Sequence, residues 1–220
     1  MPIESRRRRR IALAALLAAA FSIVTPGARA QPSPADFAVA AANDRVQEVK
    51  RLLAAGADPN TVDRNGDPVL VIATRAGNAA TVELLLAARA NVNARNGFGD
   101  TALMVASLGG RGELVRKLRA GGADVNQKGW TALIYAATGG HDEIVRYLLA
   151  EGADIDAAAP NGTTALMMAV REGRSSTLEL LLVRGADVNR RNDSGASALE
   201  WARRGKEPAM VGRLQRAGAR

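Results

Sequence analysis

The sequence repeats itself about every 33 residues over most of its length. One phrase has the form Thr-Ala-Leu-x-x-Ala, and a second, of the form Gly-Ala-Asp-Val-Asn, recurs in phase with it. Copies of the first phrase begin at Pro68, Thr101, Thr131, Thr164 and Ser197, and copies of the second begin at Gly56, Ala90, Gly122, Gly152 and Gly185. A fixed period of roughly 20–50 residues is typical of solenoids, in which no single unit buries its apolar face alone. The repeats therefore predict a stack of similar units that folds as a whole.

The residue types within each unit predict two helices and a projecting loop. Thr at the start of the first phrase can cap a helix by accepting a backbone N–H bond, and an amphipathic stretch such as residues 143–149 follows as a second helix. The Gly before Ala-Asp is expected to end that helix in the left-handed conformation, and a further Gly to occupy each hairpin tip. These tip glycines are Gly66, Gly99, Gly129, Gly162 and Gly195. The first-phrase leucines Leu103, Leu133 and Leu166 are expected to point inward. Thr101 and Thr131 are only 30 residues apart, which predicts a shorter hairpin between them.

The two phrases resemble the ankyrin repeat, whose pattern is a turn, Thr-Pro-Leu-His-x-Ala, a Gly, a second helix with paired leucines and then Gly-Ala-Asp-Val-Asn. The resemblance covers residues 36–220 and implies a mostly α fold, a solenoid of about six stacked helix-turn-helix units with projecting β-hairpin loops. It divides the chain into an N-terminal cap at 36–62, repeats at 63–95, 96–126, 127–158 and 159–191, and a C-terminal cap at 192–220. The His of the family pattern is replaced by Val71, Met104, Ile134, Met167 and Glu200. We therefore expect apolar packing, in place of that side chain's hydrogen bonds across repeats, at four of these five positions.

Residues 1–30 have the pattern of an export signal, with residues 31–35 as a linker. Five arginines at 6–10 precede an apolar run at 11–24, and Ala28-Arg29-Ala30 is a small-x-small cleavage site. The apolar run has 14 residues and spans about 21 Å as a helix, less than the ~30 Å hydrocarbon core of a membrane. We expect cleavage after Ala30 and, from the bacterial style of the leader, a periplasmic location. An uncleaved membrane anchor is the alternative, and the Sec and twin-arginine routes both stay open.

Composition excludes several kinds of chemistry. The chain has no Cys and a single His, so it cannot build a disulfide, a thiolate nucleophile, a zinc-finger cage or a two-His metal site. That residue, His141, lies beside Asp142 and Glu143, so it could act as a base or as half of a metal site. We interpret all three as residues at the start of a helix. The sequence predicts no catalytic residue, no cofactor site and no metal site. The formal charge of +8 falls to 24 basic against 21 acidic residues beyond residue 30, and we expect these charges to be scattered. The charge is therefore weak evidence for nucleic-acid binding.

The resemblance implies a concave groove, formed by the hairpin tips and the exposed face of the first helices, that holds a protein partner. The candidate binding residues are Arg64, Asn65, Asp67, Arg75, Phe98, Asp100, Leu108, Lys128, Trp130, Thr138, Asn161, Thr163, Arg171 and Glu172, with Asp193 and Arg204 at the equivalent positions of the C-terminal cap. Phe98 and Trp130 fall on adjacent tips, and exposed aromatic residues are enriched at interface hot spots. The alternative for Trp130 is that it folds over its shortened hairpin. Tyr135 and Trp201 are expected in the core or at the floor of the groove.

The sequence thus favours a non-catalytic protein–protein interaction module that is secreted to the periplasm as a monomer. The partner is a protein that the sequence does not identify; binding to nucleic acid, or to a membrane after signal cleavage, is not expected. A second hypothesis comes from the resemblance to small exported bacterial ankyrin proteins. On that hypothesis the chain is a helper or accessory subunit of a periplasmic enzyme, such as a catalase in oxidative-stress defence. No residue of this sequence encodes that link.

Overall fold

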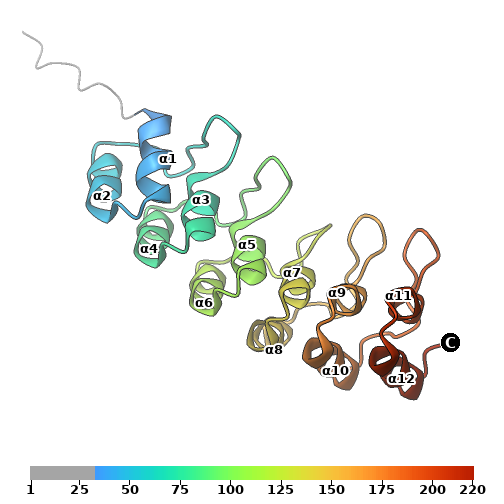
Figure 1. The fold of residues 1–220 in the computed structure, drawn as a ribbon. Helices are drawn as coiled ribbons and strands as arrows, with labels where there is room; N and C mark the ends of the chain where they lie inside the picture. Colours follow the sequence, from blue (N-terminus) through green and yellow to red (C-terminus); the bar gives the residue numbers. More distant parts are fainter. Residues whose placement is uncertain (1–32) are drawn as a thin grey trace, which may run out of the picture. The chain divides into compact units, whose positions relative to one another are not determined.

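The computed structural model describes residues 33–220, which form twelve α-helices in six successive pairs. The first helices of the pairs are α1 (Pro34–Ala42), α3 (Val69–Ala76), α5 (Ala102–Leu108), α7 (Ala132–Gly139), α9 (Ala165–Arg171) and α11 (Ala198–Arg204). The second helices are α2 (Val46–Ala54), α4 (Ala79–Ala87), α6 (Gly112–Ala120), α8 (Asp142–Ala150), α10 (Ser175–Val183) and α12 (Pro208–Arg216). Each first helix packs on its own second helix and on the first helices of neighbouring pairs, so that the two kinds of helix form two rows (Figure 1). The predicted mostly α solenoid of stacked helix-turn-helix units is confirmed.

The predicted export signal at 1–30 lies outside the described residues, as do the first two residues of the predicted linker. Across residues 33–220, none of the helices has both the length and the apolar character needed to cross a membrane.

Hydroxyl side chains cap five of the six first helices, as predicted for the Thr of the first phrase; α3 follows Pro68 and has no side-chain cap. Thr101, Thr131, Thr164 and Ser197 each accept a hydrogen bond from the backbone N–H three residues later, at 3.2–3.4 Å. In α1, Ser33 accepts the N–H of Asp36 at 3.1 Å, and Pro34 occupies the first helical turn, where its missing N–H leaves no bond unmade. This cap makes α1 begin inside the segment that we expected to be a linker.

The glycines take the backbone conformations that the repeat requires. At the end of the second helices, Gly152 has φ of +85° and its counterparts in four other repeats have φ of +85° to +90°. The copy of the Gly-Ala-Asp-Val-Asn phrase at Ala90 has Arg89 in place of this Gly, with φ of +63°. A side chain in this left-handed region costs about 1–2 kcal/mol, so the repeat tolerates the penalty once. The tip glycines have φ from +76° to +95°, as predicted.

The projecting loops are closed by single β-bridges rather than by strands. The bridges join Val62 to Pro68, Arg95 to Thr101, Ala158 to Thr164 and Arg191 to Ser197. The loop between α6 and α7 has no such bridge in the structure and is visibly the shortest projection (Figure 1). The shortened hairpin that the 30-residue spacing predicted is therefore confirmed.

The core runs along the stack between the two rows of helices. Leu103, Leu133 and Leu166 are at most 2% exposed, which confirms their inward position. The residues in place of the family His are equally buried where they are apolar: Val71, Met104, Ile134 and Met167. The fifth, Glu200, instead accepts the backbone N–H of Ser197 at 2.7 Å and completes a capping box. The expected apolar replacement of that His at four positions is confirmed.

Side-chain amides and carboxylates join successive turns along one edge of the stack. In each case a side-chain oxygen accepts a backbone N–H of the next repeat, at 2.7–3.1 Å; the acceptors are Asn60, Asn93, Asn126, Asp156 and Asn189. Asn126 also donates to the Gly152 carbonyl at 2.9 Å. This Asn/Asp ladder fixes the spacing between repeats and holds the loops in place.

Candidate protein-binding surface

The candidate surface consists of the loop tips together with the solvent-facing side of the first helices. The loops project beyond the row of first helices (Figure 1). One first-helix position points partly toward this side and holds Ile72, Val105, Tyr135, Met168 and Trp201, which are partly buried except for the buried Met168. Three residues further along the same face lie Arg75, Leu108, Thr138, Arg171 and Arg204. The surface therefore consists of equivalent positions, held by the stacked helices, whose side chains differ from one repeat to the next.

Most of the predicted binding residues are accessible. The exposed ones are Arg64, Asn65, Arg75, Phe98, Leu108, Lys128, Asn161, Arg171 and Glu172, with Asp193 and Arg204 in the last repeat. Asp100, Trp130 and Thr138 are partly buried. Asp67 and Thr163 are buried, at 7% and 1% exposed. The side chains of these last two are withdrawn from solvent.

The expectation that Asp67 and Thr163 offer side chains to a partner needs correction, and hairpin closure supplies the reason. The backbone carbonyl of each residue accepts an N–H from across its loop, Asp63 N to Asp67 O and Ala159 N to Thr163 O, both at 2.9 Å. That bond draws the residue under its own hairpin. Asp67 then accepts a 2.6 Å hydrogen bond from Nη1 of Arg75. Asp67 therefore orients a surface arginine instead of meeting a partner itself.

Asp100, Tyr135 and Trp130 form a cluster across two repeats that the sequence did not predict. Tyr135 on α7 donates its hydroxyl to Oδ1 of Asp100 at 2.6 Å. Burial, followed by this hydrogen bond to a carboxylate, raises the pKa of Tyr135, so the residue stays a neutral donor. The Trp130 ring packs on Tyr135, with 5.9 Å between ring centroids. Trp130 therefore packs on its own first helix and presents only part of its ring.

Phe98 differs from Trp130 because nothing in the fold needs its ring. Its side chain is 88% exposed at the tip of the loop between α4 and α5. The loop beneath it is held by the buried Asn96, whose Oδ1 accepts the N–H groups of Phe98 at 3.0 Å and Asp100 at 2.8 Å. The tip therefore presents an apolar ring on a fixed backbone. Leu108, 44% exposed at the end of α5, adds apolar surface from the same repeat.

His141 has a structural role in this structure. Its Nε2 lies 2.9 Å from the carbonyl oxygen of Leu108, at the end of the first helix of the preceding repeat. Residues at the same position elsewhere make the same kind of contact, as in the bond from Arg174 Nε to the Thr138 carbonyl at 3.1 Å. Residues 33–220 contain no group of three or more His, Asp or Glu side chains placed to hold a metal ion. The interpretation of His141 as a residue at the start of a helix is thus supported by its contacts.

The comparisons with known proteins agree with this geometry. The family described as ankyrin repeats (3 copies) matches residues 37–128 and 110–192. The chain belongs to the ankyrin repeat family. A solved ankyrin repeat domain from Acinetobacter baumannii AYE is 33% identical, with a TM-score of 0.75 over 86% of this chain and 100% of that one. The human ASB11 ankyrin repeat domain is 29% identical, with a TM-score of 0.76 over 84% of each chain. No curated protein sequence matches.

Membership in this family gives the surface a general meaning. Ankyrin repeat domains are typically non-catalytic modules that mediate protein–protein interaction. The buried frame of this chain follows the family pattern, whereas its tips and first-helix faces carry side chains that change from one repeat to the next. The partner is therefore to be sought at these exposed positions.

Proposed function

We propose that this ankyrin stack binds a protein partner through its loop tips and first-helix faces, and that it does so in the periplasm. The observation that carries the binding proposal is Phe98, a large aromatic side chain held 88% exposed on an ordered tip. Burying an aromatic ring at an interface releases a large apolar area, and such residues are enriched at interface hot spots.

The rigidity of the frame supports this proposal. The Asn/Asp ladder and the capped first helices hold the tips in fixed register before any partner arrives. A preordered surface loses less conformational entropy on association, so more of the contact energy contributes to affinity. A binding surface of this kind suits one partner of complementary shape.

The export part of the proposal rests on the sequence of residues 1–30, with its arginines, its apolar run and the Ala28-Arg29-Ala30 site. N-terminal sequencing of the chain recovered from a periplasmic fraction is expected to begin at Gln31. A chain that keeps residues 11–24 and sediments with membranes would refute it.

The binding proposal is tested by capturing partners with the purified protein and with two variants. Phe98→Ala is expected to weaken capture by about 30-fold, equivalent to ~2 kcal/mol, with unchanged circular dichroism. Val183→Ala is the matched control, because Val183 is 74% exposed but ends a second helix, α10, away from the tips. Trp130 is left intact, since its contact with Tyr135 makes its truncation a perturbation of folding. Equal capture by Phe98→Ala and the parent protein would remove Phe98 from the binding site.

A further inference from the structure

A row of side-chain donors links successive first helices, and the row stops at the last repeat. The residue before each second helix donates to a carbonyl near the end of the preceding first helix. The donors are Asn78 to Ala41, Arg111 to Arg75, His141 to Leu108 and Arg174 to Thr138, at 2.7–3.1 Å. In the last repeat the equivalent residue is Glu207. An ionised carboxylate has no proton to donate, so this interface lacks the bond that closes the others.

A hollow of about 400 Å³ lies at this interface, between the C-terminal ends of α9 and α11. Its lining consists of Val170, Arg171, Trp201, Arg204, Gly205 and Glu207. Two guanidinium groups thus border a site whose apolar wall includes a partly buried indole ring. Within residues 33–220, Arg171 has only the adjacent Glu172, at 3.5 Å, as an ion-pair partner, and Arg204 has none. An exposed pair of this kind contributes little, so both arginines are available to a ligand.

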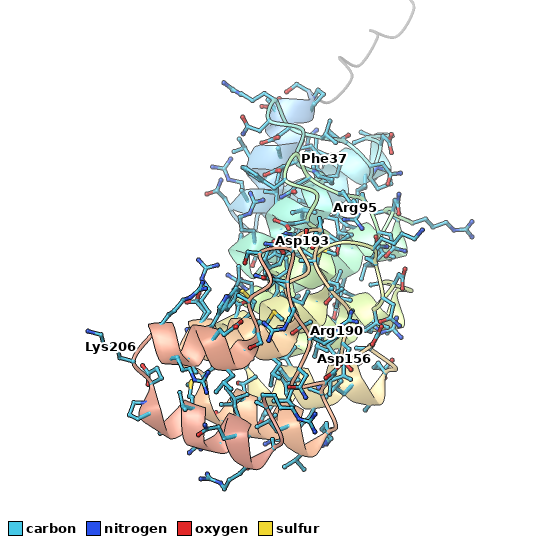
Figure 2. All side chains as sticks on the ribbon, turned by 90° about the vertical axis from the view of Figure 1, so that its right-hand side faces the viewer. Phe37, Arg95, Asp156, Arg190, Asp193 and Lys206 are labelled. Atoms are coloured by element: carbon cyan, nitrogen blue, oxygen red, sulfur yellow. The ribbon has the colours of Figure 1, made fainter. Side chains whose placement is uncertain are left out.

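Beyond residue 30, the net positive charge is concentrated at the same end of the stack. Residues 184–220 carry nine basic and four acidic side chains, whereas residues 31–183 carry fifteen basic and seventeen acidic ones. The scattered distribution expected from the totals is therefore wrong. Lys206, in the turn between α11 and α12, projects outward from the last repeat and adds to this basic end (Figure 2). An excess of positive charge at this end of the stack attracts a ligand of the opposite sign.

We propose that this hollow binds an acidic segment of the protein partner, and the inference rests on the proposed function. Carboxylates of the segment accept hydrogen bonds from Arg171 and Arg204, whose planar guanidinium groups suit bidentate recognition. An apolar side chain between those carboxylates packs on Trp201. Glu207 repels any anionic group placed beside it, so a peptide that alternates carboxylates with an apolar residue fits this mixed lining better than the unbroken charge of a nucleic acid does.

The test uses the purified protein and a short fluorescein-labelled peptide that has glutamates on both sides of a central leucine pair. Binding is followed by fluorescence anisotropy, with the glutamine analogue of the peptide as its neutral counterpart. Arg171→Gln and Arg204→Gln are each expected to weaken binding by about tenfold or more. Arg190→Gln is the matched control, because it removes the same charge from an exposed site in the loop between α10 and α11 that does not line the hollow (Figure 2). Circular dichroism checks that every variant is folded.

Glu207→Gln provides a readout that would not change in this direction if Arg171 and Arg204 only supported the fold. Because it removes a like charge from the lining, it is expected to strengthen peptide binding by a few-fold. The proposal is overturned if Arg171→Gln and Arg204→Gln bind the peptide as Arg190→Gln does. It is also overturned if the glutamine peptide binds equally well, or if single-stranded DNA of the same charge binds more tightly.

Failure of this inference can be told apart from failure of the proposed function. A partner whose capture depends on Phe98 but not on Arg171 or Arg204 removes the hollow from the interface and leaves the proposed function standing. Capture that is insensitive to Phe98, together with arginine-dependent peptide binding, removes the tip and leaves the hollow.

Discussion

Replacing Leu133 by Ala tests whether the stack is held together as the repeat register requires. Leu133 is 1% exposed on α7, which packs on α5 of one neighbouring repeat and α9 of the other. The substitution removes three carbons from the middle of the core. At about 0.8 kcal/mol for each buried methylene, the lost transfer free energy is about 2.4 kcal/mol. The cavity left behind raises the total into the range of ~2–5 kcal/mol seen for core leucines.

The assay is urea unfolding followed by far-UV circular dichroism, with the midpoint and the slope read separately. The midpoint of Leu133→Ala is expected to fall by an amount equivalent to ~2–5 kcal/mol. Leu108→Ala is the control, because it makes the same chemical change at the end of α5, where the side chain is 44% exposed. Its midpoint is expected to shift by an amount equivalent to no more than about 1 kcal/mol of unfolding free energy.

An unchanged midpoint for Leu133→Ala would refute the reasoning, since a side chain whose removal costs nothing does not fill the core. A larger effect for Leu108→Ala than for Leu133→Ala would show that the register of the first helices is wrong.

The other predictions concern the Asn/Asp ladder, the end of a second helix and a capping carboxylate. Asn126→Ala loses the bond from the N–H of Asp154 and the donor to the Gly152 carbonyl, and should lower the unfolding free energy by about 1–2 kcal/mol. Asn126→Asp keeps the acceptor and should lower it by about half as much. An Asp variant that is as unstable as the Ala variant would contradict this prediction. Gly152→Val should lower the unfolding free energy by ~1–2 kcal/mol or more, because a side chain is strained at φ of +85°. The strain is the cause rather than a clash, since an added Cβ would meet no atom within 4 Å. Unfolding at the parental urea midpoint would argue against that backbone conformation. The N–H of Ser197, with a nearby arginine, lowers the pKa of Glu200. The stabilisation of the fold by the ionised Glu200 is therefore present above the ordinary carboxyl pKa and is lost as the pH falls through the lowered value. Glu200→Gln should flatten the acid limb of a pH–stability profile, and an unaltered limb would show that Glu200 does not contribute to it.

Local patterns in the sequence determined the elements and their order. The Thr131 hydroxyl caps a helix by accepting the N–H of Ile134, three residues later, and Gly152 takes the positive φ that the turn after α8 requires. The missing three residues before Thr131 shorten a loop without reference to the rest of the molecule. Because such features depend on residues close in sequence, and because they recur five times in phase, the solenoid and its helices could be predicted without coordinates.

The identity of the usable surface depended on contacts of individual side chains and loops that the repeat pattern does not specify. Asp67 and Thr163 looked like loop residues in the sequence, but hairpin closure buries them. Trp130 looked like a partner of Phe98 in binding, but a tyrosine of its own first helix, hydrogen-bonded to the preceding repeat, takes up part of its ring. The loop closures and the ring packing join residues only four or five apart, but the repeat pattern does not specify them, and the Tyr135–Asp100 bond joins two repeats.

The hollow at the last repeat shows the same division most clearly. Glu207 in the sequence is an ordinary acidic residue at the start of a helix, and Arg171 and Arg204 are two of many arginines. Only stacking places the two arginines beside Trp201 and sets Glu207 where the other repeats have a donor. The sequence therefore determined that the chain stacks, because stacking follows from periodic burial. The tertiary structure decided which charges meet, because those distances are set across the interface between repeats and not along the chain.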